Sequence, residues 1–292
     1  MNKVLVFGSI NLDHTYELDH IVQPGETISS MHYRTAWGGK GLNQATALAK
    51  AGAEVYLAGQ IAAEEKQPLH EQCAGVGLRA DYVRTVNAPA GHAIIQVDAH
   101  GQNSIIVLPG ANGCIEDATI DEALRNFGPG DVVLLQNEIN RLEEIIPRAK
   151  AQGITVAFNP SPCKPNLQTL PLEQVDLFIL NEVEGAVLSG ETEPDRILDV
   201  LAAKFPASAV LLTLGADGSR FRCGDETDSA QAVRVQAVDT TAAGDTYTGY
   251  FLAGRLQGLS VADAMQLASR ASAIAVTRKG AADSIPTPDE LK

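Results

Sequence analysis

The sequence predicts an α/β protein with a doubly wound, mostly parallel sheet flanked by helices, together with a small β-sheet. Two observations support this prediction. Short apolar runs, typical of strands buried on both faces, alternate with helical patterns over most of the chain. Two separated segments instead alternate apolar and polar residues with a period of two, which indicates strands with one face in water.

The first buried strand is Val4–Phe7, which ends at Gly8 and Ser9. Four strands of the period-two kind follow in two segments: 12–19, Ile28–Trp37, Ala93–Asp98 and Ser104–Leu108. We expect them to form one small sheet, built from about 12–37 and 91–108 and projecting from the main body. No linker or repeat interrupts the chain, so residues 1–292 are expected to form one domain.

A helix opens at Gly38–Asn43 and ends at Gly52, because Ala45 and Leu48 share one helical face and glycine is a common helix terminator. Further helices are expected near Leu142–Gln152 and after Ser260, an N-cap residue. The remaining buried strands are Val55–Ala58, Val132–Gln136, Ile154–Asn159, Val175–Leu180 and Val210–Leu214. Ligands of such sheets bind at the carboxyl ends of the strands, so polar residues there are candidates for function.

Composition excludes several classes of protein. The formal net charge is −14 over 292 residues, which argues against nucleic acid as the main partner. The four cysteines form no metal-binding or disulfide pattern, and a reducing compartment suits them. The apolar run at the N-terminus is too short for a signal peptide or a membrane span. We therefore expect a cytoplasmic protein that does not bind membranes.

The stretch Val238–Gly249 contains the most informative chemistry. Ala242, Ala243 and Gly244 are small, so backbone N–H groups at the expected helix start can approach an anion closely. Asp245 follows directly, and a carboxylate beside an anion site would repel the anion unless it accepts a proton from an attacking hydroxyl. Phosphoryl transfer to an alcohol needs this pair of features. A plain N-cap role for Asp245 is the simpler alternative.

Other polar residues at strand ends have two interpretations each. Asn11 and Asp13 are turn formers or ligands of sugar hydroxyls. Glycines 38, 39 and 41 around Lys40 open a helix or let the backbone approach a polar ligand, but lack the spacing of a phosphate-binding P-loop. Glu138 is a helix-start acid or a substrate ligand.

The same ambiguity holds in the second half of the chain. Asn181 and Glu184 suit either an acidic helix start or a magnesium site of oxygen ligands. The segment Thr213–Gly218 is either a turn or a loop that lies along a nucleotide.

Together these segments resemble the ribokinase family, of the phosphofructokinase-B superfamily of sugar and nucleoside kinases. The matching pieces are Gly8–Asp13, Pro24–Thr27, Gly38–Asn43, Gly110–Asn112, Asn159-Pro160, Asn181-Glu182, Thr213–Gly215, Val238–Thr246 and Ala273–Ala281. They span nearly the whole chain. The resemblance implies a ribokinase-like fold, and an ATP-dependent kinase that phosphorylates the primary hydroxyl of a pentose such as D-ribose.

The resemblance also implies roles for individual residues. Asp245 matches the catalytic base, and Ala243 and Gly244 match the anion hole. Positions that match sugar contacts are Asn11, Asp13, Gly38, Gly39, Lys40, Asn43, Glu138 and Asp245. Positions that match nucleotide contacts are Asn181, Thr213, Gly215, Gly218, Gly244 and Ser269.

The resemblance also implies two metal sites. Glu184 matches an acid linked indirectly to Mg²⁺ and phosphate. A site for an activating monovalent cation, normally K⁺, matches Asp239, Thr241, Ala275, Arg278, Gly280 and Ser284. The resemblance further implies that the small sheet is a lid over the sugar and that two lids pair in a homodimer.

One segment departs from the family. Gly59–Lys66 lacks the Gly-x-Asp-x-x-Gly pattern that the family usually has beside the sugar pocket. The departure concerns the identity of the sugar more than the reaction. The alternatives are therefore a kinase of the same fold for deoxyribose, a ketohexose or a nucleoside, although aromatic residues that could stack on a base make up only 5% of the chain. Alternatives of other classes are a catalytically idle sugar-binding protein and an acidic interaction module.

Overall fold

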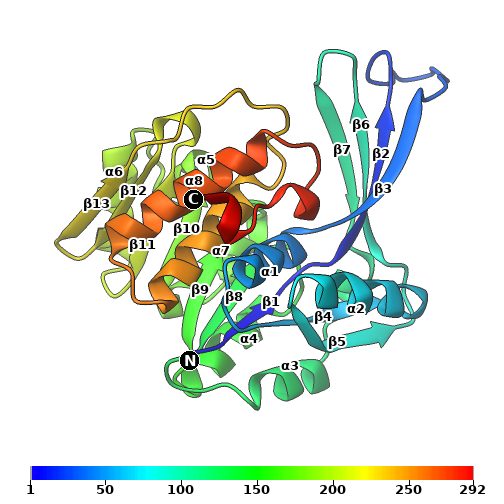
Figure 1. Ribbon diagram of the computed structural model, residues 1–292. Coiled ribbons are helices and arrows are strands. Elements are labelled where there is room, and N and C mark those ends of the chain that lie inside the picture. The colour runs from blue at the N-terminus through cyan, green and yellow to red at the C-terminus, as the bar shows by residue number, and fades with distance from the viewer. Residues whose placement is uncertain (1, 292) are drawn as a thin grey trace.

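The structure is a computed structural model that describes residues 2–291, and its main feature is a nine-stranded sheet between two layers of helices (Figure 1). In spatial order the strands are β13 (Glu226–Ala230), β12 (Ser219–Cys223), β11 (Ala209–Thr213), β10 (Leu177–Asn181), β9 (Thr155–Asn159), β8 (Val132–Gln136), β1 (Val4–Phe7), β4 (Val55–Ala62) and β5 (Arg79–Val86). The strands from β11 to β5 run parallel, and β12 and β13 add an antiparallel hairpin at one edge. The predicted doubly wound, mostly parallel sheet is confirmed.

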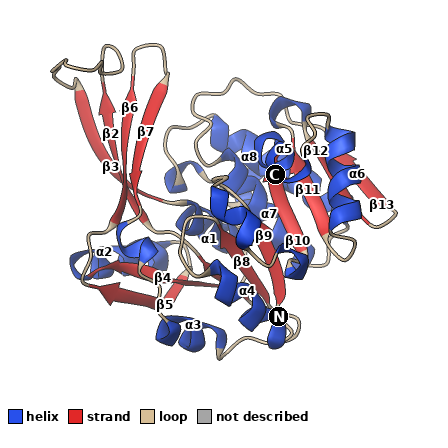
Figure 2. Cartoon of the chain, turned by 180° about the vertical axis from the view of Figure 1, so that it is seen from behind, coloured by secondary structure: helices blue, strands red, loops and turns tan. Residues whose placement is uncertain are grey.

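Both faces of this sheet are covered, as the continuous apolar strands predict. In β1, Val4 and Val6 point into one hydrophobic cluster, while Leu5 and Phe7 point into the other. The first cluster lies under α1 (Lys40–Lys50), α2 (Lys66–Gly75), α7 (Ala243–Leu256) and α8 (Val261–Val276). The second lies under α3 (Asp117–Leu124), α4 (Leu142–Ala151), α5 (Glu182–Ser189) and α6 (Pro194–Lys204) (Figure 2). No helix within residues 2–291 combines the length and apolar character needed to cross a membrane.

The direction of chain progression reverses at β1. From β1 the chain builds β4 and β5 on one side, and it then returns to build β8 to β13 on the other. The ends of β1 and β8 therefore lie side by side at a topological switch point, where open α/β sheets bind their ligands.

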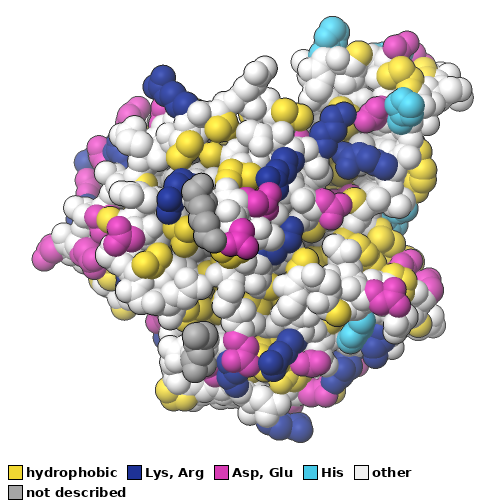
Figure 3. Space-filling view, viewed as in Figure 1, with side chains coloured by type: hydrophobic (Ala, Val, Ile, Leu, Met, Phe, Trp, Pro, Cys, Tyr) yellow, Lys and Arg dark blue, Asp and Glu magenta, His cyan; other side chains and the backbone are white. Residues whose placement is uncertain are grey.

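The second sheet has four strands, in the order β3 (His32–Gly38), β2 (Asn11–Glu17), β6 (Gly91–Val97) and β7 (Asn103–Leu108). Its two segments, far apart in sequence, join through the parallel pair β2–β6. The outer end of this small sheet stands away from the main body (Figures 1 and 3). Ile94, Ile106 and Leu108 occupy the face opposite to Asp13 and are exposed.

Two predicted strand boundaries were wrong by more than two residues. The strand predicted as Ile28–Trp37 begins only at His32, because Met31 closes the connection by donating its N–H to the Glu17 carbonyl oxygen at 2.8 Å. The strand predicted as Val55–Ala58 continues to Ala62, because the unpredicted strand β5 pairs with it along that length.

Ser260 caps α8, as predicted, by accepting a hydrogen bond from Asp263 N–H at 3.1 Å.

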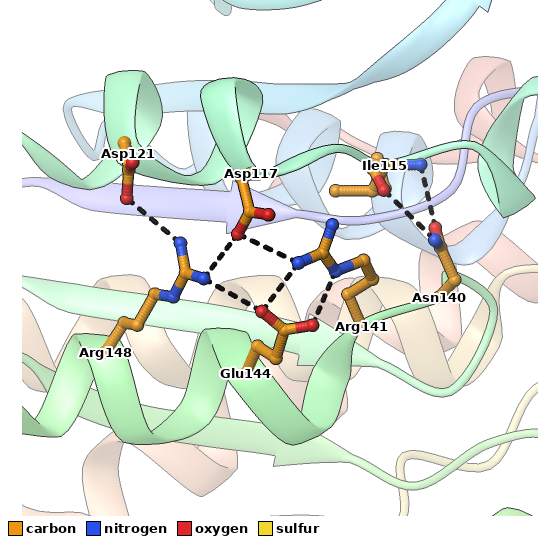
Figure 4. Close-up of polar contacts among 7 residues, drawn as sticks. All are labelled: Ile115, Asp117, Asp121, Asn140, Arg141, Glu144 and Arg148. Carbon is orange, nitrogen blue, oxygen red and sulfur yellow. Dashed lines mark hydrogen bonds and ion pairs between the residues drawn. The ribbon is translucent and has the colours of Figure 1, made fainter.

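Elsewhere, α3 and α4 are joined by an exposed ion-pair network (Figure 4). Arg141 bonds to Asp117 at 2.8 Å and to Glu144 at 2.6 Å. Arg148 bonds to Glu144 at 2.8 Å and to Asp121 at 3.0 Å. Exposed pairs contribute little energy individually, so this network helps to align the two helices rather than to stabilise the fold strongly.

Candidate active site

The N-terminus of α1 packs directly on the loop that follows β1. Ser9 Oγ accepts a hydrogen bond from Gly41 N–H at 3.1 Å, and the Ser9 carbonyl oxygen accepts one from Leu42 N–H at 2.9 Å. A Cβ atom on Gly41 would lie 2.4 Å from the Ser9 nitrogen, so only glycine permits this approach. The predicted glycine-rich helix entry is therefore a close contact between backbones as well as a turn.

Glu138, just beyond β8, lies at this helix N-terminus. Its Oε2 atom accepts hydrogen bonds from Lys40 N–H at 3.1 Å and from the Ser9 hydroxyl. The acid thus meets the positive end of the α1 dipole, although α1 is distant from it in sequence. Ser9 is a site residue that the sequence interpretation did not single out.

Asp13 lies on β2 against Gly38, where a Cβ atom would come within 2.0 Å of the carboxylate. The pKa of Asp13 is raised from 3.8 to about 6. Burial is the largest cause, the negative charges of Glu138 and Asp245 add to it, and the positive charge of Arg34 opposes them. Burial lowers the pKa of Lys40, but Asp245, Glu138 and Glu184 outweigh it, so that this pKa is raised overall. Several carboxylates therefore surround one partly buried ammonium group, a set that suits a neutral ligand with many hydroxyls.

Asn11 is held by Asn112, a buried residue of the short helix Gly110–Gly113. Asn112 Nδ2 donates to Asn11 Oδ1 at 2.7 Å, and Asn112 Oδ1 accepts from Ile10 N–H at 2.9 Å. This arrangement fixes the Asn11 amide with its oxygen toward Asn112. The Asn11 NH₂ group is thus oriented as a donor.

Asp245 is the third residue of α7 and is 7% exposed. Its Oδ2 accepts from Asn43 Nδ2 at 3.1 Å, and its Oδ1 accepts from Gln44 Nε2 at 2.9 Å. Among the described residues, none donates a hydrogen bond to the buried Asn43 Oδ1, which leaves an acceptor beside the carboxylate for a ligand hydroxyl. Asp245 does not cap α7, because the N-cap residue is Ala242, with a φ of 61°.

Residues expected at the nucleotide line a cleft of about 590 Å³ beside Asp245. Those that line it are Thr213, Gly215, Gly218, Gly244 and Ser269, together with Ala243. Its lining also includes the apolar residues Val233 and Val235. Gly244 joins the two halves of the site, because it lines this cleft and directly precedes Asp245.

Asn181 is not among the residues that line this cleft. Asn181 and Glu184 instead form a capping box at the start of α5. Asn181 Oδ1 accepts from Val183 and Glu184 N–H groups, and the Glu184 carboxylate accepts from Asn181 N–H at 2.8 Å. The pair therefore starts α5, and Glu184 is near enough to raise the pKa of Lys40.

Two residues of the expected cation site, Thr241 and Gly280, contact Asp239. Its carboxylate accepts from Thr241 N–H at 2.9 Å and from Gly280 N–H at 3.0 Å. Burial raises the pKa of Asp239, but these hydrogen bonds and Arg34 lower it by more. Arg278 N–H bonds the Ala275 carbonyl oxygen at 3.1 Å. Ser284 is buried nearby in sequence, and its hydroxyl donates to the Ala281 carbonyl oxygen at 2.8 Å.

No group of three or more His, Cys, Asp or Glu side chains within residues 2–291 is arranged to hold a metal ion. A metal in this site would therefore depend on oxygens other than a protein carboxylate cluster, such as those of a nucleotide or of the backbone.

Comparisons with known proteins show which family the chain belongs to. The family model described as "pfkB family carbohydrate kinase" matches residues 1–288. Ribokinase from Haemophilus influenzae is 34% identical over 99% of this chain and 97% of its own length. Deoxyribokinase from Salmonella typhi is 30% identical over 99% and 97%, respectively. The structure of Arabidopsis thaliana ribokinase complexed with ribose and ATP has a TM-score of 0.86 and 32% identity, over 99% of this chain and 97% of that one.

The matched family spans almost the entire sequence, and its relatives share both the fold and the length of this chain. Its members are phosphotransferases with an alcohol group as acceptor, which agrees with a buried carboxylate beside a helix N-terminus. This chain belongs to the pfkB family of carbohydrate kinases.

Proposed function

We propose that this carbohydrate kinase transfers the γ-phosphoryl group of ATP to the primary hydroxyl of D-ribose and releases D-ribose 5-phosphate and ADP. The position of Asp245 is the observation that supports this proposal most directly. The residue contacts Asn43, which we assign to the sugar, and it directly follows Gly244, which lines the cleft assigned to the nucleotide. The relatives named ribokinase and the neighbouring structure with ribose and ATP support ribose as the acceptor.

In the proposed mechanism, Asn11, Asp13, Lys40, Asn43 and Glu138 hold the sugar hydroxyls. Asp245 accepts the proton of the primary hydroxyl while the oxygen of that hydroxyl forms a bond to the γ-phosphorus. The bond from that phosphorus to the bridging oxygen breaks, and ADP leaves with the electron pair. Because the attacking hydroxyl loses its proton late in a loose transition state, an ordinary carboxylate suffices as the base.

The N-terminus of α7 would stabilise the negative charge that builds on the phosphoryl oxygens. Gly244 N–H lies in the first turn, where helical N–H groups lack partners within the helix. Ala243 N–H donates to the Thr240 carbonyl oxygen at 3.2 Å and would have to give up this bond to take part. Gly244 is therefore the main proposed donor.

We also propose two metal ions. Mg²⁺ carried by the nucleotide would neutralise phosphate charge, and Glu184 would contact it through water, consistent with a carboxylate already bonded to Asn181 N–H. K⁺ would bind oxygens contributed by Asp239, Thr241, Ala275, Arg278, Gly280 and Ser284, mostly backbone carbonyls, and would hold the loop that leads to α7. The lowered pKa of Asp239 favours a cation there.

The small sheet, about 12–37 and 91–108, is proposed to be a lid on a single kinase domain. Asn11 and Asp13 belong to β2, so movement of this sheet would carry sugar-binding groups and exclude water. The exposed apolar residues Ile94, Ile106 and Leu108 on its other face would be covered by the same face of a second chain. We therefore propose a homodimer, and a cytoplasmic location that suits four free cysteines.

The test is release of ADP from Mg·ATP by the purified protein, with ribose, deoxyribose, fructose and adenosine compared, each with and without K⁺. Turnover with ribose, stimulated by K⁺ and reduced about 10²- to 10⁴-fold in kcat by Asp245→Asn, is the expected result. Turnover with deoxyribose but not with ribose would instead assign deoxyribose as the acceptor, as the name of the Salmonella relative suggests for that protein. An Asp245→Asn enzyme with unchanged kcat would refute the mechanism.

A further inference from the structure

Behind Asp245 lies a buried row of side-chain amides that the proposed reaction has not used. It consists of Gln44 on α1, Gln136 at the end of β8 and Asn159 at the end of β9, with exposed fractions of 1%, 0% and 8%. We propose that Gln44 is a positioning residue that orients the carboxylate of Asp245 for proton abstraction, and that Gln136 and Asn159 fix the orientation of Gln44. This inference rests on the proposed role of Asp245 as the base.

The hydrogen bonds specify one orientation of the Gln44 amide. Its Nε2 donates to Asp245 Oδ1 at 2.9 Å and to Asn159 Oδ1 at 3.2 Å, so both of its hydrogens are used. Its Oε1 accepts from Gln136 Nε2 at 2.7 Å. A flipped amide would direct oxygen at the Asp245 carboxylate and NH₂ at the Gln136 NH₂ group, and both contacts would be repulsive.

The partners of Gln44 are themselves held. Asn159 Nδ2 donates to the Ile179 carbonyl oxygen at 2.8 Å, which keeps Asn159 Oδ1 directed at Gln44. Gln136 fits only because residue 8 is glycine, since a Cβ atom there would lie 2.1 Å from Gln136 Oε1. The ends of β8 and β9 thus determine which Gln44 atom faces Asp245.

The two amide contacts of Asp245 differ in kind. Asn43 belongs to the proposed sugar pocket and keeps an unpartnered oxygen, so a ligand can compete for this side chain. Gln44 has no vacant hydrogen, and its contacts are with the protein. Gln44 can therefore hold Oδ1 while Oδ2 remains in reach of the substrate hydroxyl.

A purely structural role explains this row poorly. Gln136 Oε1 is buried and accepts no hydrogen bond from residues 2–291, so the row includes a polar atom that the protein itself does not satisfy there. An apolar core at these positions would avoid that cost. Retention of the amides is explained if one of them is needed to aim the base, since a misplacement of about 1 Å can reduce a rate 10²-fold.

The first test is Gln44→Met, which keeps the length of the side chain and removes the donor. We expect kcat to fall about 10- to 100-fold, while KM for the sugar and for ATP changes less than about threefold, because the base is misplaced and the ligand contacts remain. Gln257→Met is the matched control. Gln257 Nε2 donates to the Ala51 carbonyl oxygen at 2.8 Å, which joins the same two helices at their opposite ends, and kcat should be unchanged.

The second test is Gln44→Glu, which keeps the shape and the acceptor for Gln136 and therefore decides the question alone if Gln44→Met does not fold. It places a second carboxyl group against Asp245, and two such groups hold a proton more tightly than one. The acid limb of the pH profile of kcat should move to higher pH by at least about one unit. An unmoved limb would show that residue 44 does not contact the carboxylate that acts as the base, and the kcat-against-KM split of Gln44→Met separates a positioning role from a structural one.

The inference is overturned if Gln44→Met keeps kcat within about twofold of the wild type, or if the acid limb of Gln44→Glu coincides with that of the wild type. All variants are compared with wild-type turnover of ribose in the same assay. If the wild type does not turn over ribose, the proposed function fails. If it does and the Gln44 variants are unaffected, only the present inference fails.

Discussion

Asp13→Asn is expected to make the sugar-free enzyme more stable at neutral pH while it weakens sugar binding. Burial beside Glu138 and Asp245 raises the pKa of Asp13 from 3.8 to about 6, so the charged form is unfavourable in the folded protein. Asparagine has nearly the same shape and no charge. It therefore removes an electrostatic cost that the ligand pocket imposes on the fold.

The magnitude and its sign follow from linkage. Between pH 4 and 6 the folded protein binds the proton of Asp13 more tightly than the unfolded chain does, so stability falls as the pH rises through about 6. A difference of about two pKa units, at 1.36 kcal/mol each, corresponds to about 3 kcal/mol at pH 8 and about half of that at pH 5. Below pH 4 the difference disappears.

Urea denaturation of wild type and Asp13→Asn at pH 8, 5 and 4, without sugar, measures this difference. Asp19→Asn is the control, because Asp19 is an exposed acid a few residues further along and its replacement should change stability little. In the same variant, KM for ribose should rise about 10- to 100-fold through loss of a charged acceptor. The reasoning is refuted if Asp13→Asn is no more stable than the wild type at pH 8, or if its advantage is the same at every pH.

Three further predictions concern the same site. Ribose KM of the wild type should be about tenfold higher at pH 5 than at pH 7, because the ionised fraction of Asp13 falls from about 90% to about 10%; a flat profile between these values would contradict the pKa of about 6. Gly41→Ala should cost about 1–3 kcal/mol in urea denaturation, because its Cβ would lie 2.4 Å from Ser9 N, whereas Gly75→Ala, with no atom within 4 Å, should gain up to about 1 kcal/mol. Asp239→Ala should abolish stimulation by K⁺ in the ADP-release assay, because it frees the backbone of Thr241 and Gly280 at once; retained stimulation would place the cation elsewhere.

Local signals in the sequence were sufficient for much of the fold. Continuous apolar runs located strands such as Val4–Phe7 and Val132–Gln136 with the bounds that the structure has. Both edge strands of the nine-stranded sheet, β5 and β13, were missed for a physical reason, and β12 was missed with them. In β5 and β13, buried and exposed residues do not follow a continuous or strictly alternating pattern, because one side of an edge strand lacks a neighbour.

The candidate site could be predicted where its residues lie close together within one short segment of the sequence. Small residues before Asp245, and Asn11 and Asp13 after the first strand, can be identified because a helix start and a strand end are local features. Asn181 and Glu184 show the limit of prediction from the sequence, because a capping box and a set of metal ligands can have the same residue types at the same spacing. Ser9 and Asn112 lie within segments already noted, but their polar partners are more than 100 residues away.

The sequence by itself determined most of the elements, their order and the position of an acid in the first turn of a helix, because hydrophobic periodicity and helix-terminus chemistry act over a few residues. Only the tertiary structure decided which side chains meet. Gln44 and Asp245 are 201 residues apart in the chain. They meet because α1 crosses α7 so closely that a Cβ on Gly249 would lie 2.4 Å from the Ala47 side chain. Such an approach depends on the packing of the whole sheet and its helices, and no local pattern encodes it.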